Sequence, residues 1–131
     1  MKNFAAGAKR ILVVEDEPAV SQVCLRVLTG EGFEVDIASD GRVAQDMIEG
    51  KQYDLCLVDM RIPKMNGKEL CQWLVKKYPQ LVRRLIFTTG DMVGGDTDDF
   101  LEQAGRPVLP KPFTLDELKA IVRETLKGIE E

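Results

Sequence analysis

The 131-residue chain contains no histidine. Because histidine is the commonest general base and the commonest metal ligand in proteins, its absence excludes Ser-His-Asp triads and histidine-based zinc sites. It also excludes phosphorylation of a histidine within this chain. Carboxylates, lysines and hydroxyl groups must therefore carry any chemistry that the protein performs.

Cysteine is scarce as well, since Cys24, Cys56 and Cys71 are the only three. Their odd number and the absence of a C-x-x-C pair argue against a disulfide framework. Two of them lie in apolar stretches typical of a protein core. This usage predicts a reduced protein of the cytoplasm.

Long hydrophobic runs and an excess of positive charge are also missing. No run approaches the roughly eighteen apolar residues needed to span a bilayer, and the first ten residues, MKNFAAGAKR, are too short and too polar for a secretion signal. The formal net charge is -4, without the basic stripe that nucleic-acid binding calls for. We therefore expect neither membrane insertion nor direct binding to nucleic acid.

Short apolar runs alternate along the chain with stretches of helical period. Strands are expected at residues 11–14, 34–38, 55–58, 85–88 and 108–109. Helices are expected at residues 18–30, 43–50, 70–78 and 114–129. The pattern assigns Val23 and Val75 to the apolar faces of the first and third helices. Between the last two strands we expect only a helical turn or two near residues 100–104, because residues 91–99 carry two glycines and four aspartates.

This alternation predicts a single α/β domain, and the length suits one hydrophobic core. Five strand–helix units with short connections predict a doubly wound, five-stranded parallel sheet with helices on both faces. The last helix should begin with a capping box formed by Thr114 and Glu117.

Polar side chains follow four of the predicted strands. Because all strands of a parallel sheet end at the same edge, these side chains should converge although they are far apart in sequence. Taken singly, each could be a helix cap, a turn former or a solvated charge. The polar residues at the four strand ends are Glu15, Asp16, Asp59, Thr88, Thr89 and Lys111.

Three carboxylates at one edge need a compensating positive charge. Two carboxylates about 4 Å apart repel by roughly 4 kcal/mol at an effective dielectric constant of 20. Hard oxygen ligands without histidine or cysteine favour Mg²⁺, with Mn²⁺ as the alternative. A cation with open coordination positions recruits phosphate, so Lys111 and Thr89 would contact phosphoryl oxygens and Asp59 would be the nucleophile.

Four segments in this order resemble the receiver domain of bacterial two-component response regulators. They are ILVVEDE at 11–17, LCLVDMRIPKMNG at 55–67, LIFTTGD at 85–91 and LPKPF at 109–113. The resemblance extends from about Lys9 to Leu126. We accordingly expect a leader at 1–8, a receiver domain at 9–127 and a C-terminal tail at 128–131.

The resemblance implies a signalling module, and not an enzyme, that takes phosphate from a phosphohistidine on a partner kinase or phosphotransfer protein. Asp59 would accept the phosphate, and Thr89 and Lys111 match the hydroxyl and the amine of the family. The bond from Lys111 to Pro112 would be the family's cis peptide. Phosphorylation would switch the surface formed by the fourth strand and the weak helix that follows it.

The resemblance also implies the metal ligands. Asp16, Asp59 and the backbone carbonyl of Arg61 would bind Mg²⁺, and Glu15, which replaces the commoner aspartate, would hold the metal through water. The longer glutamate keeps the charge and extends the reach by one methylene, so we expect metal binding to survive.

The sequence departs from the family pattern at a switching position. Val108 stands where the family usually has an aromatic residue whose inward turn reports phosphorylation. An aliphatic side chain cannot make that movement, and Gly94 and Gly95 suggest instead a loop that orders on phosphorylation. Simple loop flexibility is the alternative explanation for the two glycines.

Two charged residues, Arg61 and Asp91, lie two positions beyond Asp59 and Thr89. We hypothesise that they pair across the mouth of the site and slow the hydrolysis of the acyl phosphate. Two separate solvated charges are the alternative, because exposed ion pairs are worth little.

Three other functions compete with this one. A phosphate-independent interaction domain would not need the complete set of acids with Thr89 and Lys111. A haloacid-type phosphohydrolase needs D-x-D after the first strand, where this chain has E-D-E. A flavin-binding module would need a phosphate loop there, and EDEPAV is acidic. The sequence leaves open the partner kinase, dimerisation, and whether the chain is a standalone receiver, part of a regulator or the receiver end of a hybrid kinase.

Overall fold

The structure is a computed structural model that describes residues 8–90 and 95–130, with the side chains of 95–97 and 128–130 left outside the description. The five strands are β1 Arg10–Val14, β2 Glu34–Ala38, β3 Leu55–Asp59, β4 Leu85–Thr89 and β5 Val108–Pro110. The helices are α1 Pro18–Gly30, α2 Gly41–Gly50, α3 Gly67–Lys77, α4 Pro79–Val82, α5 Gly95–Ala104 and α6 Leu115–Glu130.

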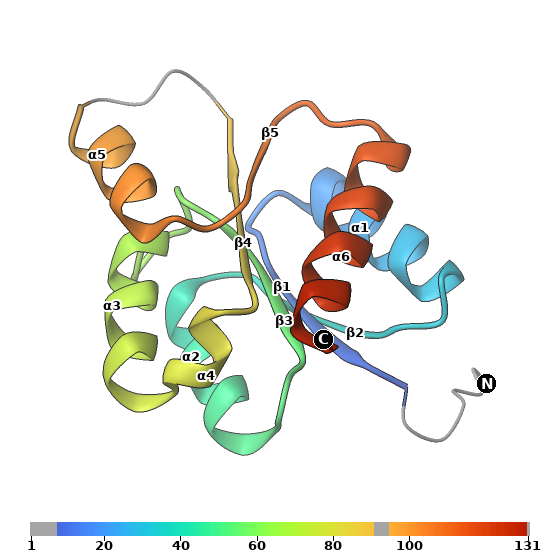
Figure 1. Cartoon of the computed structure of the whole chain (residues 1–131), viewed down its shortest axis with the longest axis horizontal. Helices are drawn as coiled ribbons and strands as arrows, with labels where there is room; N and C mark the ends of the chain where they lie inside the picture. The colour runs from blue at the N-terminus through green and yellow to red at the C-terminus, as the bar shows by residue number, and fades with distance from the viewer. Residues whose placement is uncertain (1–7, 91–94, 131) are drawn as a thin grey trace.

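The strands form one parallel sheet in the order β2-β1-β3-β4-β5 (Figure 1). Every strand is a short run rich in branched apolar residues, and β3 is buried along its whole length. A strand that is covered on both faces can be apolar throughout, as β3 is before Asp59. The doubly wound five-stranded sheet predicted from the sequence is confirmed.

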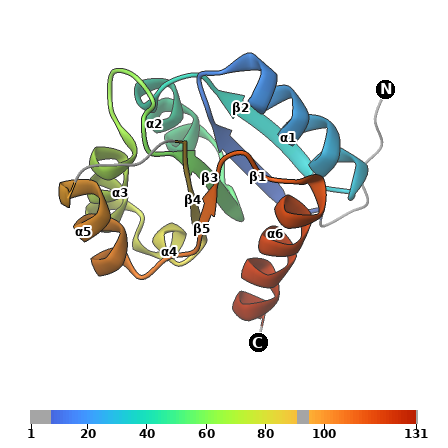
Figure 2. The same cartoon turned by 90° about the horizontal axis from the view of Figure 1, so that it is seen from above.

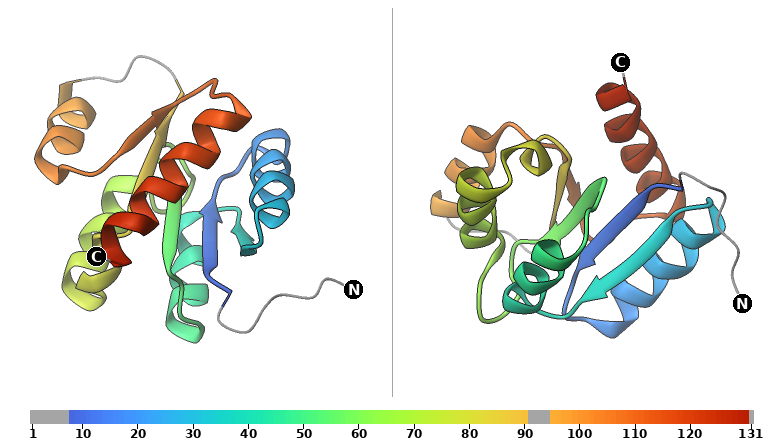
Figure 3. Two further views of the ribbon diagram at one scale, coloured as in Figure 1. Left: turned by 45° about the vertical axis from the view of Figure 1, so that its right-hand side comes forward. Right: turned by 90° about the horizontal axis from the view of Figure 1, so that it is seen from below.

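Helices cover both faces of this sheet. Figure 2 shows α1 and α6 on one side and α2, α3, α4 and α5 on the other. Each side buries its own apolar cluster: Ile11, Leu28 and Val122 belong to the first, and Phe87 and Leu74 to the second. Figure 3 shows α6 lying beside α1, which it contacts.

The last helix begins as the sequence predicts. The backbone N–H of Glu117 donates to Thr114 Oγ1 at 3.0 Å, and the backbone N–H of Thr114 donates to Glu117 Oε1 at 2.8 Å. This reciprocal pair is a capping box. A second capping box, between Asn66 and Glu69 at the start of α3, was not predicted.

Several predictions about the helices were wrong in detail. Val23 and Val75 are exposed, at 38% and 55%, so they lie outside the buried faces of α1 and α3. The short helix α4 was not predicted, and it starts at Pro79, where the fixed φ of proline suits the first turn. The helix before β5, α5, is longer than the turn or two expected. Among the described residues, no helix is long and apolar enough to cross a membrane.

Candidate functional site

Three strands deliver polar side chains to the carboxyl edge of the sheet. Asp59 is the last residue of β3, the central strand, and Glu15 directly follows β1. Lys111 directly follows β5, and its backbone N–H donates to the carbonyl of Thr89 at 2.7 Å. The backbone N–H of Glu15 donates to the carbonyl of Ala38 at 3.0 Å, which extends the sheet by one residue at this edge.

The ammonium group of Lys111 joins three carboxylates. Its Nζ lies 2.8 Å from Glu15 Oε1, 3.1 Å from Asp59 Oδ2 and 3.3 Å from Glu17 Oε1. The side chains of Glu15 and Asp59 are buried, Lys111 is partly buried with 13% of its side chain exposed, and Glu17 is exposed. A buried charge is stable only with partners of opposite charge, so these groups stabilise one another at the sheet edge.

Burial raises the pKa of Glu15, although the hydrogen bond from Lys111 opposes this shift. For Lys111 burial alone lowers the pKa, but the hydrogen bonds to Glu15 and Asp59 outweigh it and raise the pKa above its ordinary value. The amine therefore stays protonated at neutral pH, as the cationic role predicted for it requires.

The backbone around Asp59 holds its carboxylate in place. Oδ1 accepts the backbone N–H of Arg61 at 3.1 Å, and Oδ2 accepts a hydrogen bond from Lys111. The N–H of Gly67, the first residue of α3, donates to the carbonyl of Met60 at 3.2 Å. A Cβ at Gly67 would lie 2.9 Å from Met60 Cα, so only glycine lets α3 approach the end of β3 so closely.

The two threonines at the end of β4 differ in their surroundings. Thr88 pairs in register with Asp59 and is buried, and its hydroxyl has no hydrogen-bond partner among the described residues. Thr89 is half-buried and lies beside Lys111 through the backbone hydrogen bond. A Cβ on Gly90 would lie 3.9 Å from Lys111 Cδ, so that residue also adjoins the lysine. The role of the Thr89 hydroxyl stays a prediction.

The predicted metal ligands are brought together only in part. One carboxylate oxygen each from Glu15, Glu17 and Asp59 lies within 4.8 Å of the others, whereas Asp16 is exposed and does not belong to this group. Sequence reasoning passed over Glu17. The run E-D-E does not distinguish its three acids, and only the fold does: the backbone N–H of Glu17 donates to Glu15 Oε2 at 3.1 Å, which brings these two residues together.

The positions expected to modulate the site are less defined. Arg61 is exposed at the start of the loop after β3. Asp91 and Gly94 lie outside the described residues, so the pairing of Arg61 with Asp91 stays a hypothesis. Val108 is half-buried on β5 and packs against the core of the α2 to α5 side. The peptide bond between Lys111 and Pro112 is cis.

The donor set fits a hard divalent cation. Three carboxylates from two segments gather around one positive group, and no thiol lies among them. Magnesium prefers oxygen ligands and is typically held by one or two carboxylates and several waters. The structure therefore supports the kind of metal site that the sequence predicted, with Glu17 added to the candidate ligands.

Buried carboxylates and a lysine at the carboxyl edge of a doubly wound parallel sheet are the arrangement that the resemblance to receiver domains implied. The family model of the response regulator receiver domain matches residues 11–123, and the chain belongs to this family. The resemblance noted in the sequence is thereby confirmed.

Curated relatives are full-length regulators. The chain is 38% identical over 117 residues to the transcriptional regulatory protein TcrA of Mycobacterium tuberculosis, covering 87% of this chain and 44% of that protein. It is 34% identical over 119 residues to the response regulator ArlR of Staphylococcus epidermidis, covering 89% of this chain and 52% of that protein. The chain thus spans about half the length of the curated relatives it matches.

Solved structures of receiver domains have the same fold. A CheY-like receiver domain protein from Methanospirillum hungatei superposes with a TM-score of 0.85 at 31% identity, over 94% of this chain and 97% of that one. The receiver domain of a signal transduction histidine kinase from Syntrophus aciditrophicus superposes with a TM-score of 0.83 at 26% identity, over 95% and 94%.

Proposed function

We propose that Asp59 is the residue that accepts the phosphoryl group, and that a phosphohistidine of a partner kinase or phosphotransfer protein donates it. The observation that carries this proposal is the convergence of three strand ends on the ammonium of Lys111, 3.1 Å from Asp59 Oδ2. The carboxylate attacks phosphorus as the bond to the donor nitrogen breaks, and the bonding electron pair leaves with the imidazole. The partner supplies the histidine that this chain lacks.

Asp59 is better placed for this attack than the neighbouring acids. It lies on the central strand, and each of its oxygens accepts one hydrogen bond, from Arg61 N–H or from Lys111, so lone pairs remain on both. Glu17 is largely exposed, and Glu15 follows β1, which is not the central strand. Phosphoryl transfer needs positioning and charge neutralisation more than a base, so no histidine is required in this chain.

Mg²⁺ would be held by Asp59, with Glu15 and Glu17 as further candidate ligands from the acidic group. Asp16 and the backbone carbonyl of Arg61 are the ligands that the family resemblance adds. When bound, it would neutralise the negative charge of the phosphoryl oxygens. Lys111 holds a second positive charge at the same edge, and Thr89 offers a hydroxyl beside it. After transfer, the amine of Lys111 would move toward the added negative charge on Asp59. This movement would carry the electrostatic change to the neighbouring end of β4.

Labelling with phosphoramidate, a small donor with a P–N bond, tests the proposal. Intact-mass spectrometry of the wild type with Mg²⁺ should show a single phosphoryl adduct, which Asp59→Asn should lack and EDTA should suppress. Asp46→Asn, which removes an exposed aspartate on α2, is the matched control and should label like the wild type. Equal labelling of Asp59→Asn and the wild type would assign the phosphate to another residue.

A further inference from the structure

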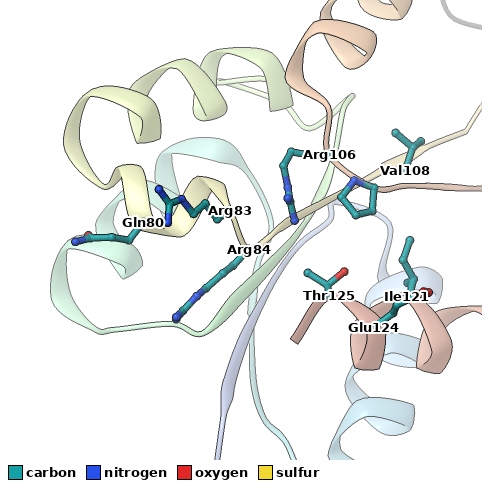
Figure 4. Close-up of a pocket in the computed structure, with 9 residues that line it drawn as sticks. Gln80, Arg83, Arg84, Arg106, Val108, Ile121, Glu124 and Thr125 are labelled. Atoms are coloured by element: carbon teal, nitrogen blue, oxygen red, sulfur yellow. The ribbon is translucent and has the colours of Figure 1, made fainter. Parts of the chain in front are cut away.

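A cavity lies at the edge of the sheet opposite the one that carries Asp59 and Lys111. Its volume is about 840 Å³, and it is bounded by α4, by the segments that lead into β4 and β5, and by α6 (Figure 4). Because Arg84 and Pro107 precede their strands, this cavity lies at the amino edge, whereas Asp59 and Lys111 lie at the carboxyl edge. Of the residues that line it, only Val108, at the switching position, has a role in the receiver function described above.

The cavity is positively charged, although the chain as a whole is acidic. Three arginines, Arg83, Arg84 and Arg106, line it against one glutamate, Glu124. Arg84 has a distant partner, since its Nη1 lies 3.8 Å from Asp54 Oδ1. Within the part of the chain that the structure describes, no carboxylate pairs with Arg83 or Arg106.

Arg106 is the unusual member of this group. It is half-buried, its Nε donates to the carbonyl of Leu85 at 3.2 Å, and burial lowers the pKa of its guanidinium. Figure 4 shows its side chain extending toward α6, where Ile121 and Thr125 lie. The bond from Nε fixes the guanidinium and leaves its terminal N–H groups for other acceptors. Partly buried charges are normally paired, so a fixed arginine without a carboxylate partner among the described residues points to an anion from outside the chain.

The other residues that line the cavity indicate which kind of chemical group is attached to the anion. Pro107, Val108 and Ile121 form an apolar part of the wall, and the volume is within the range of small-molecule sites. Inorganic phosphate would fill only a fraction of this space. An organic phosphate can place its charged group at Arg106 and its apolar body against these side chains, since arginine matches phosphate geometry with two parallel hydrogen bonds.

We propose that this cavity binds an organic phosphate, a phosphate ester with an apolar or aromatic body, through Arg106. Such a ligand would lie against β5 and α6 and would give this receiver an input separate from phosphorylation of Asp59. The inference does not depend on which residue accepts the phosphoryl group.

Titration of the ¹⁵N-labelled chain with phenyl phosphate, in buffer free of divalent cations, tests this proposal. Saturable shifts are expected at the amides of Arg106, Val108, Ile121 and Thr125. AMP should act in the same way, and inorganic phosphate should bind more weakly. No saturable shift at these amides, or shifts confined to the Asp59 edge, would overturn the proposal, as would equal affinities for phenyl phosphate and inorganic phosphate.

Three variants make the test specific. Arg106→Ala should weaken phenyl phosphate binding by about tenfold or more, because it removes a charge-assisted pair of hydrogen bonds. Arg26→Ala, which removes an exposed arginine from α1, is the matched control and should bind like the wild type. Glu124→Gln removes an exposed negative charge from the lining and should strengthen binding about twofold. Unchanged affinity in Arg106→Ala, or in Glu124→Gln if Arg106→Ala does not fold, contradicts the proposal.

Discussion

At the scale of single residues, the protein places charges where burial makes them sensitive to their partners. Lys111 stays protonated because Glu15 and Asp59 compensate for its burial. The same balance between burial and hydrogen bonds sets the pKa of Asp36 on β2, for which no chemical role is proposed. Its Oδ2 accepts the hydroxyl of Tyr53 at 2.7 Å and Nζ of Lys51 at 3.0 Å. Burial alone raises the pKa of Asp36, but these two hydrogen bonds outweigh it and lower the pKa.

The lowered pKa of Asp36 predicts a pH-dependent effect of Tyr53→Phe. In the wild type, the ionised carboxylate contributes stability above the ordinary aspartate pKa, and this contribution is lost as pH falls through the lower folded-state value. Removing the Tyr53 hydroxyl should therefore lower the free energy of unfolding by about 1 kcal/mol at pH 7. Urea unfolding of both proteins should show the difference shrinking as pH falls below the ordinary aspartate pKa.

Tyr78→Phe is the matched control for this experiment. Tyr78 is half-buried and packs its ring against Trp73 at a centroid distance of 5.4 Å, and its hydroxyl has no hydrogen bond to the described part of the chain. Its removal should change stability little at either pH. A Tyr53→Phe effect that persists unchanged into acid would mean that the hydroxyl acts by packing and not through the Asp36 carboxylate.

At the scale of elements, the loop after β3 is fixed by the start of α2. The N–H of Gly41 donates to the carbonyl of Pro63 at 3.3 Å, and Asp40 caps the helix by accepting the N–H of Val43 at 2.9 Å. A Cβ at Gly41 would lie only 2.0 Å from the carbonyl oxygen of Met65. The helix and the loop that follows Asp59 therefore depend on each other for their positions.

This contact predicts opposite effects for two glycines of the same helix. Gly41→Ala forces the Met65 backbone away and should destabilise the chain by about 2 kcal/mol. Gly50→Ala is the matched control, because a Cβ at that position would have no neighbour within 4 Å among the described residues, and alanine there should be neutral or stabilising by up to about 1 kcal/mol. Urea unfolding measures both changes. Equal stabilities of the two variants would show that the loop moves without penalty.

At the scale of the whole molecule, the parallel sheet separates two edges with different chemistry. The carboxyl edge gathers acids and Lys111, and the amino edge carries the cavity with three arginines. Between these edges, a separate apolar cluster fills the space between the sheet and the helices on each of its two faces. Cys24 belongs to one cluster, and Cys56 and Cys71 belong to the other.

The buried thiols report on this packing and give the last prediction. All three cysteines are free and buried, and burial, with a smaller contribution from the charge of Glu15, raises the pKa of Cys24 to about 12. Because the thiolate is the reactive form, the native chain should react with Ellman's reagent at least about 100-fold more slowly than the chain in denaturant.

A variant with a surface thiol is the control for this measurement. Ser39→Cys adds a thiol at an exposed position between β2 and α2, and one thiol of this variant should react rapidly under native conditions. A wild-type thiol that reacted as rapidly as the one introduced by Ser39→Cys would contradict this prediction. It would show that one face of the sheet opens without unfolding of the whole domain.

Local sequence patterns were enough to predict the sheet, most of the helices and the edge at which the site forms. Apolar runs and capping residues act locally, and parallel strands must end together, so the convergence of Glu15, Asp59 and Lys111 follows from strand order. Which neighbouring side chains face inward could be seen only in the folded chain. Folding turned Glu17 toward Lys111 and left Asp16 exposed, and it placed Arg106 in a cavity beside α6. Those outcomes depend on packing between segments far apart in sequence, which no local pattern encodes.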